Sequence, residues 1–119
     1  MATKIGINGF GRIGRQVLRA IIERYPNSLE VVAINDLGDT STNAHMFRYD
    51  SNYGIYPGKV DVSEKNICID GMEISVIQER EPSKIKWGDF GVEVVVESTG
   101  FLLMQIKRLG IWKAGRTKL

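Results

Sequence analysis

Three glycines at G-x-G-x-x-G spacing, Gly9, Gly11 and Gly14, follow a short apolar run at residues 4–8. The first glycine lets the chain turn tightly off a strand, and the second lets backbone approach a pyrophosphate without a Cβ in the way. The third lets the following helix pack close to the strand, so that the free N–H groups of its first turn face an anion. The spacing therefore predicts a strand, a turn and a helix around a dinucleotide phosphate site.

The spacing alone is weak evidence, because the chain has 13 glycines. Its context strengthens the prediction. The glycines open a run with apolar residues at helical spacing, residues 13–25, in which Tyr25 belongs to the apolar face and Arg19 to the polar face. Asp36 ends the next apolar run about 20 residues further on, where a dinucleotide-binding fold places the acid that binds the ribose. The alternative, a glycine turn of only structural meaning, does not account for this acid.

Further apolar patterns predict the other elements. Residues 29–35 form a strand without clean alternation, as expected of a parallel strand covered on both faces. Residues 40–43 offer several N-caps for a short helix that runs to about Arg48. Residues 49–58, rich in Tyr, Asn, Gly and Pro, are predicted to be a loop.

The second half of the chain predicts an antiparallel hairpin and a last strand. Residues 59–62 and 67–77 alternate apolar and polar residues, with a two-residue turn at Asp70-Gly71. Residues 92–97 are apolar enough to be a central strand. The predicted fold is α/β: an incomplete Rossmann-like, mostly parallel sheet with helices on both faces and an inserted antiparallel hairpin. In this incomplete sheet, the strand at residues 92–97 is expected to have an open side.

Composition is that of a single globular domain with a modest core, since 43% of the 119 residues are hydrophobic and 25% are charged. The N-terminus lacks a signal pattern, so we expect a cytoplasmic protein. Cys68 is the only cysteine, and we expect it buried in a hairpin strand as a packing residue. His45 is the only histidine and is expected at a helix surface or in packing. No cluster of metal ligands is found, and no metal is predicted.

The glycine motif also carries a resemblance. Residues 5–15, Ile-Gly-Ile-Asn-Gly-Phe-Gly-Arg-Ile-Gly-Arg, resemble the opening of phosphorylating glyceraldehyde-3-phosphate dehydrogenases. The resemblance covers residues 1–100 almost continuously and implies the NAD-binding part of an enzyme that oxidises and phosphorylates an aldehyde. Further runs that agree in the same order are Ala-Ile-Asn-Asp at 33–36, Tyr-Asp-Ser-Asn-Tyr-Gly at 49–54, Trp-Gly at 87–88 and Val-Val-Glu-Ser-Thr-Gly at 95–100.

The motif and the resemblance together predict NAD as the cofactor. A carboxylate at Asp36 can accept hydrogen bonds from both hydroxyls of the adenosine ribose and repels the additional phosphate of NADP. Arg12 is expected nearest the phosphates. The resemblance implies that Arg80 lies beside the adenine, mainly through its backbone, and that Thr99 and Gly100 lie toward the nicotinamide. The predicted cofactor-binding residues are Asn8, Gly9, Gly11, Arg12, Ile13, Gly14, Asn35, Asp36, Arg80, Ser98, Thr99 and Gly100.

No catalytic residue is predicted. In the family that the chain resembles, the reactive thiol lies in a Ser-Cys-Thr-Thr-Asn run, which does not occur here. The resemblance implies that the catalytic cysteine, its partner histidine and the substrate phosphate sites lie beyond Leu119, so we expect the isolated chain to be inactive. The family forms homo-tetramers, and the sequence does not establish whether this chain assembles. Neither a nucleic acid nor a membrane is expected as a partner.

The resemblance stops after Gly100, where the charge pattern also changes. Residues 1–100 carry 11 Lys and Arg against 14 Asp and Glu, a balance of −3, whereas residues 101–119 carry five cations and no acid. Residues 102–108 can be encoded so that the neighbouring reading frame gives Phe-Thr-Asp-Ala-Asp-Lys-Ala, the family's own continuation. We interpret 1–100 as an incomplete dinucleotide-binding domain and 101–119 as a basic tail that follows a single-base deletion near the codon of Phe101.

The alternative function is a non-catalytic interaction protein. In that interpretation, residues 101–119 are a genuine basic amphipathic segment that binds an acidic membrane or a nucleic acid. The tail is expected not to pack as the family's helix and strand do, although its residues 105–108 tolerate a helix.

Overall fold

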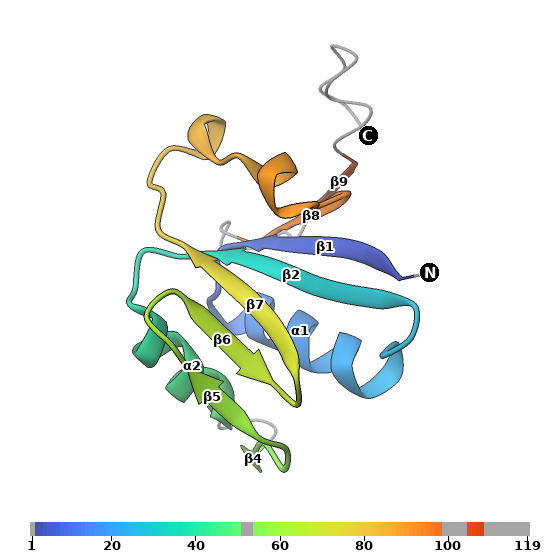
Figure 1. Ribbon diagram of the computed structural model, residues 1–119, viewed down its shortest axis with the longest axis vertical. Helices are drawn as coiled ribbons and strands as arrows, with labels where there is room; N and C mark the ends of the chain where they lie inside the picture. Colours follow the sequence, from blue (N-terminus) through green and yellow to red (C-terminus); the bar gives the residue numbers. More distant parts are fainter. Residues whose placement is uncertain (1, 51–53, 99–104, 109–119) are drawn as a thin grey trace.

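A computed structural model describes residues 2–50, 54–98 and 105–108 of the chain. Its centre is a seven-stranded mixed sheet with the strand order β5-β6-β7-β2-β1-β8-β9 (Figure 1). The strands of this sheet are β1 (Thr3–Asn8), β2 (Leu29–Asn35), β5 (Val60–Val62), β6 (Asn66–Ile69), β7 (Met72–Ile77), β8 (Val94–Glu97) and β9 (Gln105–Arg108). The helices of the described ranges are α1 (Arg12–Arg24) and α2 (Thr40–Arg48), with two 3-10 helices, η1 (Pro82–Lys84) and η2 (Trp87–Phe90).

The four central strands, β7, β2, β1 and β8, run parallel to one another. Their carboxyl ends therefore meet at one edge of the sheet, the edge at which open α/β sheets bind ligands. Outside this centre, β6 pairs antiparallel with β7 across the predicted turn, where Asp70 and Gly71 both have positive φ, 50° and 87°. The predicted α/β, Rossmann-like fold with an inserted antiparallel hairpin is confirmed.

The two faces of the sheet are covered differently. Helices α1 and α2 contribute Leu18 and Phe47 to one large core cluster, which covers one face. On the other face, Trp87 of η2 packs with Val95 and other residues in a smaller cluster. A Cβ on Gly6 of β1 would lie 2.7 Å from two ring carbons of Trp87, so the indole lies directly against the strand backbone. The short 3-10 helices thus take the place of α-helices on this face.

Three local predictions differ from the structure. Residues 49–58 contain two short antiparallel strands, β3 (Tyr49–Asp50) and β4 (Gly54–Ile55), rather than loop alone. The N-cap of α2 is Asp39, whose Oδ1 accepts a hydrogen bond from the Thr42 N–H at 2.7 Å, rather than one of the four residues that follow. The last predicted strand begins at Val94, two residues later than expected, after the 3-10 helix η2.

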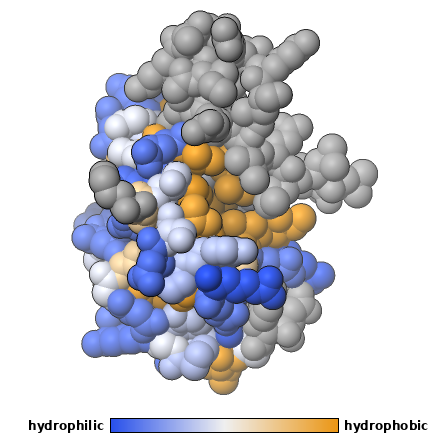
Figure 2. Space-filling view, turned by 90° about the vertical axis from the view of Figure 1, so that its right-hand side faces the viewer, coloured by the Kyte–Doolittle hydropathy of each residue, from blue (hydrophilic) through white to orange (hydrophobic). Residues whose placement is uncertain are grey.

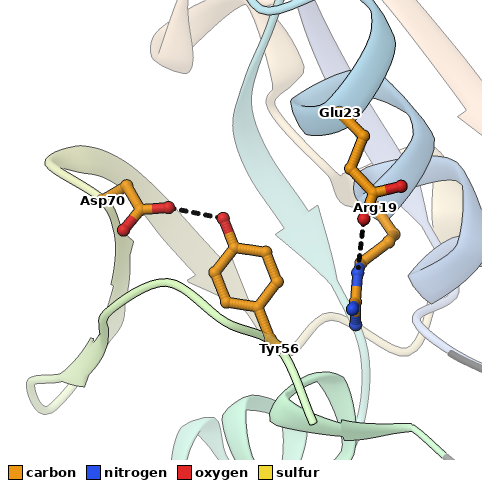
Figure 3. A network of polar contacts seen from close by, with 4 residues as sticks. All are labelled: Arg19, Glu23, Tyr56 and Asp70. Atoms are coloured by element: carbon orange, nitrogen blue, oxygen red, sulfur yellow. Dashed lines mark hydrogen bonds and ion pairs between the residues drawn. The ribbon is translucent and has the colours of Figure 1, made fainter. Parts of the chain in front are cut away.

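Arg19 of α1 was expected on the polar face of its helix but is only 4% exposed. Its Nε donates to Glu23 at 3.0 Å, and its guanidinium carbon lies 5.0 Å from the centre of the Tyr56 ring. The Tyr56 hydroxyl donates to Asp70 (Figure 3). The other carboxylate oxygen of Asp70 accepts the Lys59 N–H at 2.8 Å. Burial and the Asp70 carboxylate raise the pKa of Tyr56 to about 12. These contacts connect α1 to the hairpin turn.

Strand β9 corrects two expectations about the tail. Gln105–Arg108 pairs antiparallel with β8, with Gln105 opposite Glu97 and Arg108 opposite Val94. The outer side of β8 is therefore paired rather than open, and residues 105–108 are a strand rather than a helix. The rest of the predicted tail, residues 101–104 and 109–119, lies outside the described residues.

Hydrophobic surface gathers in the middle of one side of the molecule, with hydrophilic side chains to its left and below it (Figure 2). The large hydrophobic side chains that are most exposed in the described ranges include Ile55, Leu37 and Tyr25. Tyr25 had been expected on the apolar face of α1, but it follows the last turn of that helix and is 51% exposed. Among the described residues, no helix has the length and apolar character needed to cross a membrane.

Candidate functional site

The glycine turn joins β1 to α1 at the carboxyl edge of the parallel strands. Gly9 has a φ of 94°, a left-handed conformation that favours glycine, and its N–H donates to the Asn35 carbonyl at 2.8 Å. Gly14, on the first turn of α1, is buried against this turn: a Cβ there would lie 2.3 Å from the Gly9 carbonyl oxygen. The roles predicted for the first and third glycines, a tight turn and close packing of helix on strand, agree with this geometry.

Gly11 is the N-cap of α1, and a Cβ on it would meet no atom within 4 Å. No side chain of the described residues caps this helix. The N–H groups at the start of α1 therefore have no side-chain acceptor in that part of the chain, in contrast to the start of α2, which Asp39 caps. An anion is the group that would satisfy them best.

The half-buried Asp36 follows β2 and holds the turn through its side chain. Its Oδ1 accepts the Phe10 N–H at 3.1 Å, and its Oδ2 accepts the Gly38 N–H at 3.0 Å. Its own N–H donates to the Ile77 carbonyl at 2.9 Å. Each carboxylate oxygen has a second lone pair, so both can still accept a hydrogen bond from a ligand. The carboxylate is thus held in one orientation at the edge of the cavity.

Buried polar side chains form the floor of the site. Asn8 and Asn35, the last residues of β1 and β2, are 3% and 6% exposed, and Asn35 Nδ2 donates to Asn8 Oδ1 at 2.9 Å. Ser98 Oγ donates to the Gly9 carbonyl at 2.6 Å and lies 3.1 Å from the Asn8 carbonyl. The floor therefore ties the ends of three parallel strands to the glycine turn.

A cavity of about 550 Å³ opens above this floor. A volume of this size suits a small-molecule or cofactor site. Seven of the twelve predicted cofactor-binding residues line it together with two others; the nine lining residues are Asn8, Gly9, Gly11, Asn35, Asp36, Leu37, Glu79, Arg80 and Ser98.

The other five predicted residues are not part of this lining. Arg12, expected nearest the phosphates, is the exposed first residue of α1, and Ile13 next to it is half-buried. Gly14 is covered by the turn, as described above. Thr99 and Gly100 lie outside the described residues.

Leu37 and Glu79 were missed from the sequence. Leu37 is 59% exposed directly after Asp36. An apolar residue next to the acid that ends a strand was the sequence signal that could have identified it. Glu79 follows the carboxyl end of β7, which the sequence did not place beside β2. Its N–H donates to Asn35 Oδ1 at 2.8 Å, and this contact between distant segments brings it to the cavity.

The remaining candidate residues lie away from the cavity. Cys68 of β6 is half-buried, not buried as expected, because it lies on the face of the strand opposite the buried Ile67 and Ile69. His45 is exposed on α2, with its ring centre 4.6 Å from that of Tyr49, as a surface position predicts. Within the described ranges, no three His, Cys, Asp or Glu residues are grouped so as to hold a metal ion.

Comparison with known proteins identifies this arrangement. The profile of the family described as "Glyceraldehyde 3-phosphate dehydrogenase, NAD binding domain" matches residues 3–105. The chain belongs to this family. Its cofactor is therefore NAD, and the predicted resemblance is confirmed.

Similar curated proteins carry the same family name. The chain is 55% identical over 97 residues to glyceraldehyde-3-phosphate dehydrogenase of Thermotoga maritima. This alignment covers 82% of this chain and 29% of the Thermotoga protein. It is 47% identical over 116 residues to the Clostridium acetobutylicum protein, 98% of this chain and 34% of that protein. With glyceraldehyde-3-phosphate dehydrogenase 1 of Bacillus subtilis, the match is 46% over 119 residues, all of this chain and 35% of that protein.

The chain thus spans about a third of the length of the curated relatives it matches. The comparisons support an NAD-binding domain and give no support to the alternative interpretation as a basic interaction protein.

Proposed function

We propose that the chain binds NAD in the cavity between the glycine turn and the carboxyl edge of its parallel strands. The observation that carries this proposal is the position of Asp36, an oriented carboxylate at the rim of a 550 Å³ cavity that the glycine turn lines above a floor of buried polar side chains. The proposed contacts are those of the twelve predicted residues, with Leu37 and Glu79 added.

The pyrophosphate is proposed to lie at the start of α1. The helix has no side-chain cap among the described residues, and Gly11 leaves open space beside it, so an anion can approach the N–H groups directly. Arg12, exposed at the first position of the helix, adds a positive charge on the solvent side. Without an anion, that charge would oppose the helix dipole.

The adenosine is proposed to lie between Asp36 and Arg80. Asp36 accepts from the ribose hydroxyls with the lone pairs that the Phe10 and Gly38 N–H groups leave unused. Leu37 provides an apolar surface for the adenine beside the backbone of Arg80. The nicotinamide then extends toward Ser98, Thr99 and Gly100.

The names of the relatives suggest the role of the whole protein. We propose that this chain supplies the NAD-binding part of a cytoplasmic glyceraldehyde-3-phosphate dehydrogenase, which oxidises and phosphorylates its aldehyde substrate in glycolysis. The 119-residue chain by itself binds the dinucleotide without transferring hydride, because it lacks the Ser-Cys-Thr-Thr-Asn run. Neither a nucleic acid nor a membrane is proposed as a partner.

Titration calorimetry with NAD and NADP tests the role of Asp36. The unaltered chain is expected to prefer NAD. Asp36→Ser removes a charge-assisted hydrogen-bond acceptor worth about 1.5–3 kcal/mol. The affinity for NAD should therefore fall about tenfold or more, and the preference for NAD over NADP should become smaller.

The matched control is Asp61→Ser, which removes an exposed carboxylate of β5, 3.7 Å from the Lys59 ammonium and away from the cavity. It should leave both affinities unchanged. Because Asp36 also holds two backbone N–H groups, thermal unfolding of each variant must show that it is folded. Equal affinity of the folded, unaltered chain for NAD and NADP would contradict the proposal.

A further inference from the structure

Three polar residues occupy equivalent positions at the carboxyl edge of the sheet. Asn8, Asn35 and Glu97 are the last residues of β1, β2 and β8, and Asn8 is the register partner of both others. Their side chains are connected in the order of the strands. Asn8 Nδ2 donates to Glu97 Oε1, and Asn35 Nδ2 donates to Asn8 Oδ1 at 2.9 Å. The chain of contacts therefore crosses three strands beneath the cavity.

This series of hydrogen bonds continues to a fourth segment, at Glu79. Asn35 Nδ2 also donates to the Glu79 carbonyl at 3.0 Å, while Asn35 Oδ1 accepts the Glu79 N–H at 2.8 Å. The amide of Asn35 thus pairs with the Glu79 peptide group much as a neighbouring strand would. Glu79 and Arg80 line the adenosine side of the cavity, so this pairing sets the position of that wall.

The direction of each hydrogen bond in this series follows from the negative charge of Glu97, with which the series begins. A carboxylate only accepts hydrogen bonds, so Asn8 must turn its NH₂ group toward Glu97 and its oxygen toward Asn35. Asn35 must then turn its NH₂ toward Asn8, which leaves its oxygen on the side of the Glu79 N–H. An Asn35 amide turned the other way would place its NH₂ against that N–H and leave buried donors without acceptors, which is costly.

We propose that Glu97 is a positioning residue for the adenosine half of NAD, acting through Asn8 and Asn35 on the backbone of Glu79 and Arg80. The proposal rests on the proposed function, because it assigns adenosine to the Arg80 side of the cavity. It also gives Asn8 and Asn35, both predicted to bind the cofactor, a supporting role, because their side-chain amides are engaged with each other and with Glu97 and Glu79.

Two variants of Glu97 and one matched control test this role in the full chain. Glu97→Leu removes the acceptor and keeps an extended side chain of similar size. Glu97→Gln keeps an oxygen that can accept from Asn8, so it should largely restore the unaltered behaviour. Glu93→Leu removes a carboxylate just before the opposite end of β8, where Glu93 accepts the exposed Lys4 N–H at 2.8 Å.

Residue-specific hydrogen exchange, followed by NMR, is the first measurement. Glu97→Leu should accelerate exchange of the Glu79 N–H about tenfold relative to the core N–H groups of β2, because Asn8 can then turn away and Asn35 is oriented only by the Glu79 peptide group itself. Glu97→Gln and Glu93→Leu should leave this ratio unchanged. Equal acceleration of Glu79 and β2 would show only a loss of global stability and would overturn the proposal, as would no change at Glu79.

Calorimetric titration with AMP and with NAD is the second measurement. Loss of one well-placed hydrogen bond corresponds to about a fivefold change in affinity, so Glu97→Leu should weaken AMP binding about fivefold. Unchanged AMP affinity in folded Glu97→Leu would overturn the positioning role. If the unaltered chain binds neither AMP nor NAD, the proposed function fails instead, and Glu79 exchange still decides whether Glu97 orients the amides.

Discussion

Gly11 and Gly14 belong to one motif, but replacing each of them by alanine should have different effects. Gly14→Ala should lower the stability of the fold, whereas Gly11→Ala should weaken NAD binding at unchanged stability. A Cβ at residue 14 would lie 2.3 Å from the Gly9 carbonyl oxygen and 3.2 Å from both Ile7 Cγ2 and Ser98 Oγ. A Cβ at residue 11 would meet nothing within 4 Å. A methyl group at residue 14 would therefore clash with the backbone of the turn. At residue 11 it would enter the space proposed for the pyrophosphate.

For Gly14→Ala, two effects oppose each other. Alanine is favoured over glycine inside a helix by about 1 kcal/mol. Overpacking costs about 1–3 kcal/mol, and the upper end applies because the obstructing atom belongs to the backbone of the turn rather than to a flexible side chain. The net loss is about 2 kcal/mol, which for a chain of 119 residues lowers Tm by about 8 °C. The displaced turn should also weaken NAD binding.

For Gly11→Ala, the effects on folding nearly cancel. Its backbone, at φ −81° and ψ −157°, is open to alanine, and restriction of the unfolded chain stabilises by about 0.4–1 kcal/mol. Alanine is a poorer N-cap than glycine by a similar amount. Stability should therefore change by less than about 0.5 kcal/mol. The methyl group should still exclude a phosphate oxygen, so NAD affinity should fall about tenfold or more.

Thermal unfolding and calorimetric titration with NAD measure the two effects on the same samples. The expected pattern is a lower Tm for Gly14→Ala, and an unchanged Tm with weakened binding for Gly11→Ala. A Gly14→Ala variant as stable as the unaltered chain would refute the packing argument. A Gly11→Ala variant that binds NAD with full affinity would refute the proposed position of the pyrophosphate.

Two further predictions concern residues away from the cavity. Folding raises the pKa of Tyr56 from 10.0 to about 12, so the free energy of unfolding should fall as pH rises between these values. Tyr56→Phe should remove the part of this fall that is due to Tyr56, measured by urea unfolding, whereas replacing the exposed Tyr25 by Phe should not. Equal pH dependence in both variants would contradict the raised pKa of Tyr56. Cys68→Ser should leave NAD binding unchanged, and the chain should produce no aldehyde- and phosphate-dependent NADH. Such activity, lost in Cys68→Ser, would make Cys68 catalytic.

The first part of the fold could be predicted because its signals are local. Glycine spacing, apolar runs and the Asp70-Gly71 turn each lie within a few residues of the structure they specify. Patterns of this kind determine β1, the glycine turn, α1, β2 and the hairpin. Asp36 could be placed for the same reason, since its distance from the glycines is set by a helix and a strand of ordinary length.

Features that depend on distant contacts could not be predicted. Arg19 lies among polar residues on the helical pattern of α1, yet it is buried because Phe47 and Tyr56 cover it. Glu79 reaches the cavity only because β7 lies parallel beside β2, a pairing that no local pattern reveals. The engagement of Asn8 and Asn35 with each other likewise needs the register of β1 against β2.

Strand β9 does not by itself show that the tail belongs to the family's fold. Only residues 98–104 separate β8 from β9, and a parallel connection needs a dozen or more residues, so a strand that returns here must be antiparallel. Ladder hydrogen bonds come from the backbone, and an unpaired strand edge accepts almost any extended segment without proline. The pairing of residues 105–108 with β8 is therefore compatible with a shifted reading frame. This pairing does not explain why residues 101–119 carry five cations and no acid. The family profile extends to residue 105, and the Bacillus subtilis relative aligns over all 119 residues, so similarity alone does not mark a boundary at Gly100. We propose that residues 101–119 follow a single-base deletion near the codon of Phe101, which the coding DNA across the Gly100 and Phe101 codons would show directly.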